Sequence, residues 1–260
     1  MRKHIVVAIL GALSLPALAV AQDEVSLLHA RSLVMTKYGL QWQSTQFDVK
    51  VRNLAHDKQV VIEYQRPNQP WRQAPLSFNR QVDDESEIWS GGIGGHGADD
   101  SASQPGPFVY RIRYQVKGQA YLDDNQQALY QLDANQGDVL YRGVVGVVDH
   151  RPLVDRFWGG QYHGHVALKN LGPAKDVQVH YTTDGWQTQR VAFAQYLPYF
   201  SYGYGSVPNP NPAGFEVWSF SLDAGGGTEI EYAVRYTVNG QTHWDNQFGR
   251  NYRVRAGTGG

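Results

Sequence analysis

Trp244 and Arg235 are predicted to stand side by side on a water-facing surface near the end of the chain. Residues 229–238 alternate between apolar and polar types, and Asn239-Gly240 follows, which is a strong signal for a two-residue β-hairpin turn. Counting the strand pairs back from that turn places Trp244 opposite Arg235. Because cross-strand partners share a face, and Arg235 lies on the polar face of its strand, we expect the Trp244 indole to be exposed.

An exposed indole beside short polar side chains suits the binding of a sugar ring. The apolar face of the sugar stacks on the indole, and its hydroxyls bond to amide, carboxylate or basic side chains. Asp245 and Asn246 directly follow Trp244, where they either bond to the sugar or satisfy backbone groups of the turn. We favour the structural role for Asp245 and leave both roles open for Asn246.

Three further features are candidates for the same chemistry, each with an alternative. Trp186 follows the turn residues Asp184-Gly185, where it contacts sugar or caps the edge of a sandwich. Lys175 contacts sugar or protects a sheet edge against aggregation. The loop over residues 196–212 either extends the sugar-binding surface or packs between domains through four aromatic residues: Tyr199, Phe200, Tyr202 and Tyr204.

No catalytic or metal site can be assigned from the sequence. His163 and His165 share one face of a predicted strand, but no third and fourth metal ligands are placed near them. Asp83-Asp84 and Asp99-Asp100 fall in predicted loops and lack the arrangement of a glycosidase carboxylate pair. Since a serine nucleophile motif and a phosphate-binding loop are also missing, we predict a protein that is not an enzyme and uses no cofactor.

Composition narrows the class of protein. The 260 residues include no cysteine, so disulfides and thiolate metal sites are excluded. The formal net charge of −1 gives no reason to expect nucleic acid or an acidic membrane as a partner. The 7 Trp and 16 Tyr exceed what a small core requires, which favours an aromatic binding surface.

Residues 1–21 have the pattern of a secretory signal peptide. Basic residues at the start precede an apolar run over 5–15, and Ala19-Val20-Ala21 offers a small-residue cleavage site. We therefore expect a secreted or periplasmic protein that begins near Gln22. The apolar run is shorter than the roughly 20 residues of a spanning helix, and no later segment reaches that length, so no membrane span is predicted.

The rest of the chain is predicted to be nearly all strand, in two copies. Alternating runs bounded by Gly, Pro, Asn and Asp predict antiparallel β-sandwiches. Residues 51–64 match 168–181 at one constant offset, and residues 113–119 match 235–241 at another. Offsets that change only between blocks indicate a repeated domain with loop insertions. We place the two domains at residues 22–135 and 136–260, with opening strands over 25–34 and 139–148.

The second copy resembles the family-21 carbohydrate-binding modules, the starch- and glycogen-binding domains. The first copy resembles this family only through its similarity to the second. The matching pieces are Val166-Ala-Leu-Lys-Asn170, the run from Lys175 to Trp186, Trp218-Ser-Phe, Tyr232-Ala-Val-Arg-Tyr and Trp244-Asp-Asn-Gln-Phe-Gly-Arg-Asn-Tyr252.

This resemblance implies an immunoglobulin-like β-sandwich that binds α-glucan and catalyses nothing. It implies that Trp186 and Trp244 form the sugar platform and that Asn246 and Arg235 supply hydrogen bonds. The sequence departs from the family at Pro173 and Ala233, where members carry aromatic residues. In the first copy Leu122 stands at the place of Trp244, so we expect that site to be altered or lost.

Two functions follow as hypotheses. In the first, an exported, non-catalytic protein of two tandem immunoglobulin-like sandwiches binds starch, glycogen or maltodextrin through its second domain, with a separate glucan-acting enzyme as a further candidate partner. In the second, the modules form an envelope or secreted scaffold whose aromatic surface meets another protein, and sugar binding is vestigial. The altered first copy motivates the second hypothesis.

Overall fold

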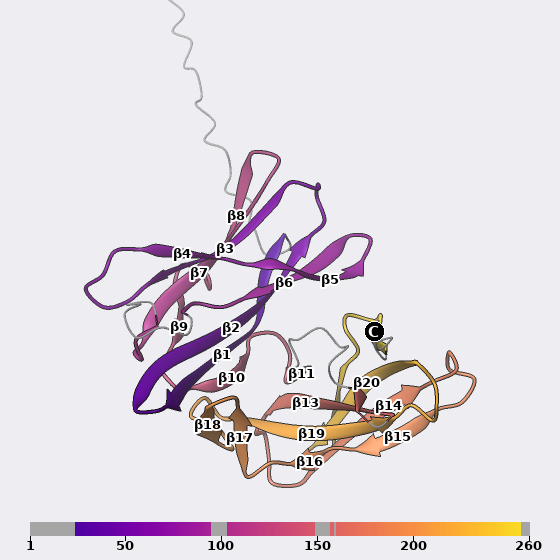
Figure 1. The fold of residues 1–260 in the computed structure, drawn as a ribbon. Coiled ribbons are helices and arrows are strands. Elements are labelled where there is room, and N and C mark those ends of the chain that lie inside the picture. The colour runs from indigo at the N-terminus through magenta and orange to yellow at the C-terminus, as the bar shows by residue number, and fades with distance from the viewer. Residues whose placement is uncertain (1–23, 95–102, 149–156, 159, 256–260) are drawn as a thin grey trace, which may run out of the picture.

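The computed structural model describes residues 24–94, 103–148, 157–158 and 160–255 (Figure 1). Secondary structure in these ranges is β-strand without helix, so the predicted all-β class is confirmed. No helix able to cross a membrane is found in the same ranges. The predicted signal peptide at residues 1–21 and the pair Asp99-Asp100 lie outside the described residues.

The strands fall into two groups along the chain. Those of the first half are β1 (Val25–Lys37), β2 (Leu40–Arg52), β3 (Lys58–Gln65), β4 (Arg72–Pro75), β5 (Ser77–Asp83), β6 (Ser86–Gly91), β7 (Phe108–Val116), β8 (Gln119–Asp123), β9 (Tyr130–Leu132) and β10 (Gly137–Leu140). Those of the second half are β11 (Val145–Val147), β12 (Phe157–Trp158), β13 (Gln161–Lys169), β14 (Lys175–Thr182), β15 (Arg190–Phe193), β16 (Gln195–Tyr196), β17 (Tyr199–Tyr202), β18 (Gly205–Pro208), β19 (Phe215–Asp223), β20 (Glu229–Val238), β21 (Gln241–Asp245) and β22 (Tyr252–Arg255).

The first sandwich packs the sheet of β1, β2, β5 and β6 against the sheet of β3, β4, β7 and β8. Strand β7 shows why these residues form a two-layered structure, because its side chains alternate strictly between buried and half-buried. Each large apolar side chain removed from water stabilises the fold by about 1.5–3 kcal/mol. The buried members of β7 are Phe108, Tyr110, Ile112, Tyr114 and Val116.

The second sandwich packs β11, β13, β19 and β16 against β15, β14, β20 and β21. Along β20 the predicted alternation is confirmed, since every second residue from Ile230 to Val238 is buried. Asn239 and Gly240 have φ angles of 50° and 73°, as a two-residue hairpin turn requires. The predicted register is confirmed as well, with Arg235 directly opposite Trp244.

The segment predicted as the second copy's opening strand is divided between the two sandwiches. Strand β10 pairs with β1 of the first sandwich, whereas β11 pairs with β13 of the second. Leu140 and Val139 accordingly pack in the first core. The domain boundary between residues 135 and 136 stays a prediction, and main-chain pairing crosses that position.

The central part of the aromatic loop over residues 196–212 joins the sheet of the first sandwich, whereas Tyr196 at its start pairs with β19 of the second. Strands β17 and β18 form a hairpin, and Gly205 of β18 pairs with Met35 of β1 (Figure 1). A Cβ at Gly205 would lie 2.9 Å from the Met35 sulfur and 3.0 Å from the Val34 carbonyl oxygen, so the close approach requires glycine. Phe200 is buried there with Leu33 of β1.

Of the two alternatives for this loop, the structure shows packing between the domains. Phe200 is 3% exposed, and the Arg31 guanidinium lies 4.4 Å from the centre of the Tyr202 ring. Tyr199 and Tyr204 are exposed, but they belong to the sheet that contains β1 and not to the sheet that carries Trp244. The loop therefore does not extend the Trp244 surface.

A buried histidine ties three neighbouring strands together at the centre of this sheet. His29 of β1 lies with Nε2 2.7 Å from Asp138 Oδ1 on β10 and with Nδ1 3.2 Å from Asp48 Oδ2 on β2. Burial opposes charge on the imidazole, but the hydrogen bonds and charges of Asp138 and Asp48 outweigh it, so the pKa of His29 is raised. The charged imidazole thus holds β10 and β2 against β1.

This arrangement predicts a pH-dependent stability. The stabilisation by His29 is complete below its ordinary pKa of 6.5 and is lost as the pH rises through the raised folded-state pKa. We expect the free energy of unfolding to fall over that interval and His29→Gln to abolish the fall. Urea denaturation from about pH 6 to pH 9, followed by tryptophan fluorescence, measures it. A variant with the wild-type pH dependence would contradict the assignment.

Candidate functional site

The outer face of the second sandwich carries the exposed Trp244. Its indole is 51% exposed and stands on the edge strand β21. Across the sheet, Arg235 of β20 lies opposite Trp244, and Gln178 of β14 lies opposite Arg235. The face thus combines an accessible π-surface with a guanidinium and an amide, the donor and acceptor types that bind sugar hydroxyls.

Asp176 orients both of these polar groups. Its Oδ2 accepts a hydrogen bond from Arg235 Nη2 at 2.5 Å, and its two carboxylate oxygens accept from Gln178 Nε2 at 2.9 and 3.1 Å. A charge-assisted bond of this kind fixes a long side chain that would otherwise sample many rotamers. The amide and the guanidinium are therefore held in place before any ligand arrives.

His180 fixes the Trp244 indole from the side. Its imidazole meets the indole edge-on, with ring centroids 5.1 Å apart. Gln189 Nε2 donates to His180 Nδ1 at 2.8 Å, so Nε2 carries the proton and donates to Gln178 Oε1 at 3.1 Å. Burial and then the charge of Arg235 lower the pKa of His180, which keeps the ring neutral.

Ala233 lies on the same face, directly opposite His180 on β20. It is 6% exposed, so neighbouring groups cover its methyl side chain. At this departure from the family pattern, β20 therefore adds no aromatic ring to the face.

Trp186 stands at another part of the same face in an unusual backbone conformation. Its φ is 68°, a region that non-glycine residues seldom occupy and that is enriched at functional sites. Its Nε1 donates to Glu231 Oε1 at 2.7 Å, and that oxygen also accepts from Asn251 Nδ2 at 2.8 Å. Glu231 on β20 thus anchors the indole of Trp186, a residue that is 37% exposed.

Asp245 is held by contacts within the second sandwich. Its Oδ2 accepts hydrogen bonds from the Val147 backbone N–H and the Tyr252 hydroxyl, both at 2.8 Å. Burial raises the pKa of the Asp245 carboxyl despite these bonds. Asn246 Oδ1 accepts from the Gly249 N–H at 2.9 Å, so this side chain shapes the loop after Trp244 through its oxygen.

Lys175 is placed away from the sugar-binding candidates. Its Nζ lies 3.0 Å from Glu216 Oε1, and both side chains are 7% exposed. Glu216 Oε2 also accepts a hydrogen bond from Trp218 Nε1 at 2.9 Å. The ammonium therefore belongs to an ion pair inside the sandwich, and neither the sugar-contact nor the edge-protection alternative describes it.

The first copy repeats this internal ion pair. Lys58 Nζ lies 2.7 Å from Glu87 Oε1, and Trp89 Nε1 donates to Glu87 Oε2 at 3.0 Å. These three residues correspond by sequence to those of the second copy. The repeat seen in the sequence therefore extends to contacts within the cores.

The outer face of the first copy differs in chemistry. Leu122, 39% exposed, lies opposite Arg113 where Trp244 lies opposite Arg235. Glu63 stands in the place of His180 and accepts hydrogen bonds from Arg111 Nε at 2.7 Å and Arg113 Nε at 2.8 Å. Instead of an aromatic platform, this face carries an ion-pair network.

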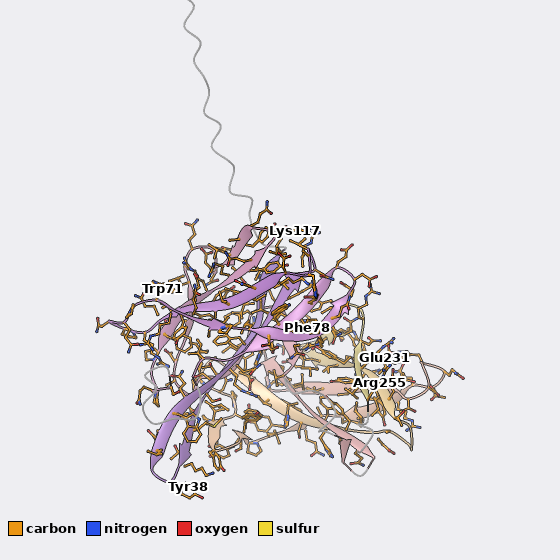
Figure 2. The ribbon with its side chains drawn as sticks, turned by 45° about the horizontal axis from the view of Figure 1, so that its top comes forward. Tyr38, Trp71, Phe78, Lys117, Glu231 and Arg255 are labelled. Atoms are coloured by element: carbon orange, nitrogen blue, oxygen red, sulfur yellow. The ribbon has the colours of Figure 1, made fainter. Side chains whose placement is uncertain are left out.

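Trp71 is the exposed indole of the first copy, and it lies beside that network. It directly precedes β4, and the Arg111 guanidinium lies 5.2 Å from the centre of its ring (Figure 2). In strand register its place corresponds to Gln189 rather than to Trp186. The two exposed indoles therefore occupy different positions in their copies.

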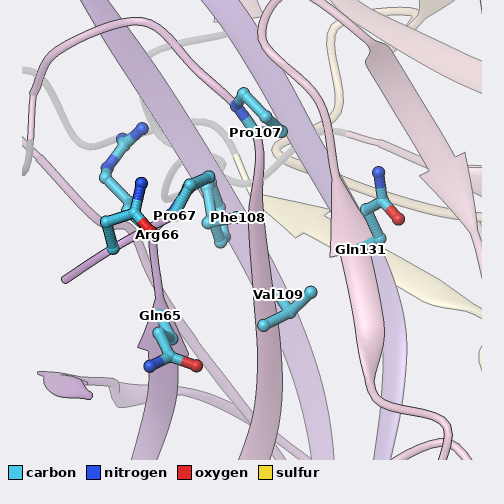
Figure 3. Close-up of a pocket in the computed structure, with 8 residues that line it drawn as sticks. Gln65, Arg66, Pro67, Pro107, Phe108, Val109 and Gln131 are labelled. Carbon is cyan, nitrogen blue, oxygen red and sulfur yellow. The ribbon is translucent and has the colours of Figure 1, made fainter. Parts of the chain in front are cut away.

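A pocket of about 320 Å³ opens elsewhere in the first sandwich (Figure 3). Arg66 and Phe108 line it, with the guanidinium 5.4 Å from the ring centre. The wall of the pocket also includes Pro67, Pro107 and Gln131. These residues lie on or beside β3, β7 and β9, so the pocket is separate from the face that carries Trp244.

Sequence reasoning missed the residues that position the predicted ones. Asp176, Gln178 and His180 alternate with the buried side chains of β14, so their shared face could have been read from the strand pattern. Their contacts could not, because those depend on rotamers across strands. The link from Glu231 to Trp186 had no sequence signal, since it joins a strand to a distant loop.

A family model matches the part of the chain that forms the second sandwich. Residues 159–255 match the family described as "Carbohydrate/starch-binding module (family 21)". The predicted resemblance of the second copy is thereby confirmed. The matched residues do not include the first copy, whose membership stays a prediction.

Curated relatives match over a similar length. Protein phosphatase 1 regulatory subunit 3E of Homo sapiens is 34% identical over 102 residues, which are 37% of this chain and 33% of that protein. Glycogen-binding subunit 76A of Drosophila melanogaster is 33% identical over 89 residues, which are 34% of this chain and 12% of that protein. The chain thus covers a third or less of the length of these relatives.

A solved structure was also matched. The starch binding domain of Rhizopus oryzae glucoamylase, in complex with beta-cyclodextrin and maltoheptaose, is 23% identical and aligns with a TM-score of 0.34. The match covers 45% of this chain and 98% of that chain.

The electrostatics of the site predict a pKa change in a variant. Because the Arg235 charge lowers the pKa of His180 and Asp176 raises it, we expect Arg235→Gln to raise the pKa of His180. NMR titration of the His180 ring protons in both proteins measures the shift. A pKa that stays the same or falls in the variant would show that the guanidinium does not act on this imidazole.

The buried ion pair predicts a loss of stability rather than of affinity. Lys175→Met leaves the Glu216 carboxylate buried without its cation, which costs about 3–5 kcal/mol in comparable cases. We expect chemical denaturation to show this loss, and Lys58→Met to show a similar loss in the first copy. Unchanged stability in Lys175→Met would argue against the structural role.

Proposed function

We propose that the second sandwich, whose residues 159–255 match the family-21 carbohydrate/starch-binding modules, binds α-1,4-glucan such as starch, glycogen or maltodextrin. The ligand lies on the outer face of β14, β20 and β21. The exposed Trp244 indole beside Arg235 is the observation that carries this proposal. The function is binding alone, without a catalytic step.

Each side chain of the face has a part in this binding. The apolar face of a glucose ring stacks on Trp244, which His180 supports edge-on. Arg235 and Gln178, both oriented by Asp176, donate to the hydroxyls.

Trp186 contributes a second aromatic contact on the same face. Its indole is bonded to Glu231 on β20, so its ring is fixed while part of it stays open to solvent. One stacked aromatic adds on the order of 1 kcal/mol beyond the area it buries. The two indoles together thus support a weak but selective site.

The first sandwich has a supporting role in this proposal. Leu122 offers no π-face, and the two arginines of its outer face are engaged by Glu63. This charged face, with Trp71 at its side, suits a contact between the first copy and another protein. Glucan binding by the second copy and protein binding by the first are compatible.

Export and a partner enzyme complete the proposal. The pattern of residues 1–21 supports secretion to the periplasm or the cell exterior, with removal of the segment near Gln22. A separate enzyme would be brought to the glucan by this module. The matched relatives include subunits named as regulators of protein phosphatase 1, so such a partner is not restricted to enzymes that act on glucan.

Affinity electrophoresis in glycogen and amylose gels tests the glucan-binding proposal. We expect the wild-type chain to be retarded and Trp244→Ala to lose at least about tenfold in affinity, because both the stacking and the buried area are removed. Trp71→Ala removes an indole of similar exposure, 42%, from the first copy and serves as the matched control. Migration of the wild-type protein unaffected by either glucan would refute the proposal.

A further inference from the structure

A row of four side chains crosses the outer face of the second sandwich from one edge strand to the other. Phe193 of β15 lies opposite Gln178, Gln178 opposite Arg235, and Arg235 opposite Trp244. We refer to Phe193, Gln178, Arg235 and Trp244 as the cross-strand row. Neighbouring strands lie about 4.8 Å apart, so the row spans about 14 Å between its two ends.

The two ends of the row are aromatic and open to solvent. Phe193 is 66% exposed and Trp244 is 51% exposed. An apolar ring this exposed on an edge strand buries little area and leaves an edge that favours aggregation. The position of Phe193 is therefore unfavourable for the isolated domain, whereas a ligand that covers the ring would bury its apolar surface.

The centre of the row is polar and already oriented. Arg235 and Gln178 both donate to Asp176, which stands one row further along the same face. The Arg235 side chain is 29% exposed, so part of the guanidinium stays open to solvent beside the ion pair with Asp176. Aromatic rings at both ends and fixed donors between them suit a chain of linked sugar rings.

The first copy lacks both aromatic ends together. Its row in the same register is Pro75, Val61, Arg113 and Leu122. Only the central arginine is shared between the two rows. The first copy thus lacks the rings of Phe193 and Trp244 and also the Gln178 amide between them. Their joint absence is expected if the three side chains bind one ligand.

We propose that Phe193 is a second stacking position that makes the site selective for long, linear α-glucan lying across the strands. This inference rests on the proposed function of the Trp244 face. A short oligosaccharide stacks on Trp244 alone, whereas a longer one reaches Phe193 and gains a second contact. Phe193 therefore determines chain-length preference rather than binding as such.

Isothermal titration calorimetry of the full chain with maltotriose and maltoheptaose tests this role. We expect wild-type protein to bind maltoheptaose more tightly, and Phe193→Ala to reduce that affinity about fivefold while maltotriose binds unchanged. Phe193→Tyr keeps a π-face and retains the wild-type preference. Phe78→Ala removes a comparably exposed ring, 55%, from the first sandwich and leaves both affinities unchanged (Figure 2).

The outcomes separate this inference from the proposed function. Wild-type protein that binds neither oligosaccharide overturns the glucan-binding proposal itself. If wild-type protein binds maltoheptaose more tightly than maltotriose and Phe193→Ala keeps the same difference in affinity, only the role of Phe193 is overturned. An equal loss in Phe78→Ala and Phe193→Ala would also overturn it, because the effect would then not depend on the cross-strand row.

Discussion

The partly buried carboxylate of Asp245 holds together the part of the second sandwich that presents Trp244. It accepts hydrogen bonds from the Val147 N–H on the opening strand β11 and from the Tyr252 hydroxyl on the closing strand β22. One side chain thus joins the strand next to the indole to both ends of the domain. Asp123 makes the corresponding bonds in the first copy, to a β1 backbone N–H and to a tyrosine hydroxyl. Such a carboxylate is costly to bury unless its acceptor capacity is used, which explains why both partners are present in each copy.

The two copies share the ion pair in their cores but carry different side chains on their outer faces. The difference follows from what each kind of substitution costs in stability. Lys175 and Glu216 form the same buried pair as Lys58 and Glu87, and removing one member of such a pair costs several kcal/mol. Exchanging an exposed side chain usually changes stability by less than about 0.5 kcal/mol, so an indole and Leu122 are both tolerated on the outer face. Substitutions in the core of each copy are therefore limited by their cost in stability. Substitutions on the outer face cost little, so a binding surface there can be gained or lost without loss of the fold.

The sequence predicted those features that depend on short-range pattern. The alternation along β20 and the Asn239-Gly240 turn specified the register, and with it the exposure of Trp244. The role of Lys175 was missed because its partner Glu216 lies on the opposite sheet, and contacts between layers leave no periodic trace in a sequence. The same reason applies to β10 and to the β17–β18 hairpin, which add to a strand more than a hundred residues away. Asp176 and His180 were recognisable as outward-facing residues, but not as the groups that orient Arg235 and the indole.

The first sandwich takes part in the site although its own outer face lacks the aromatic platform. The segment after Trp244 contacts it twice: Arg80 Nε donates to Gln247 Oε1 at 3.2 Å, and the Lys50 ammonium lies 4.5 Å from the centre of the Phe248 ring. Gln247 and Phe248 both have positive φ angles, 50° and 60°, which non-glycine residues adopt only when their surroundings hold them. Contacts from the first sandwich supply part of that restraint and limit the motion of the hairpin end. Under the proposed function, a site with one or two stacked rings gains little energy per contact, so its affinity would depend on how much ordering of the protein accompanies binding. The contacts from the first copy would then support glucan binding by the second.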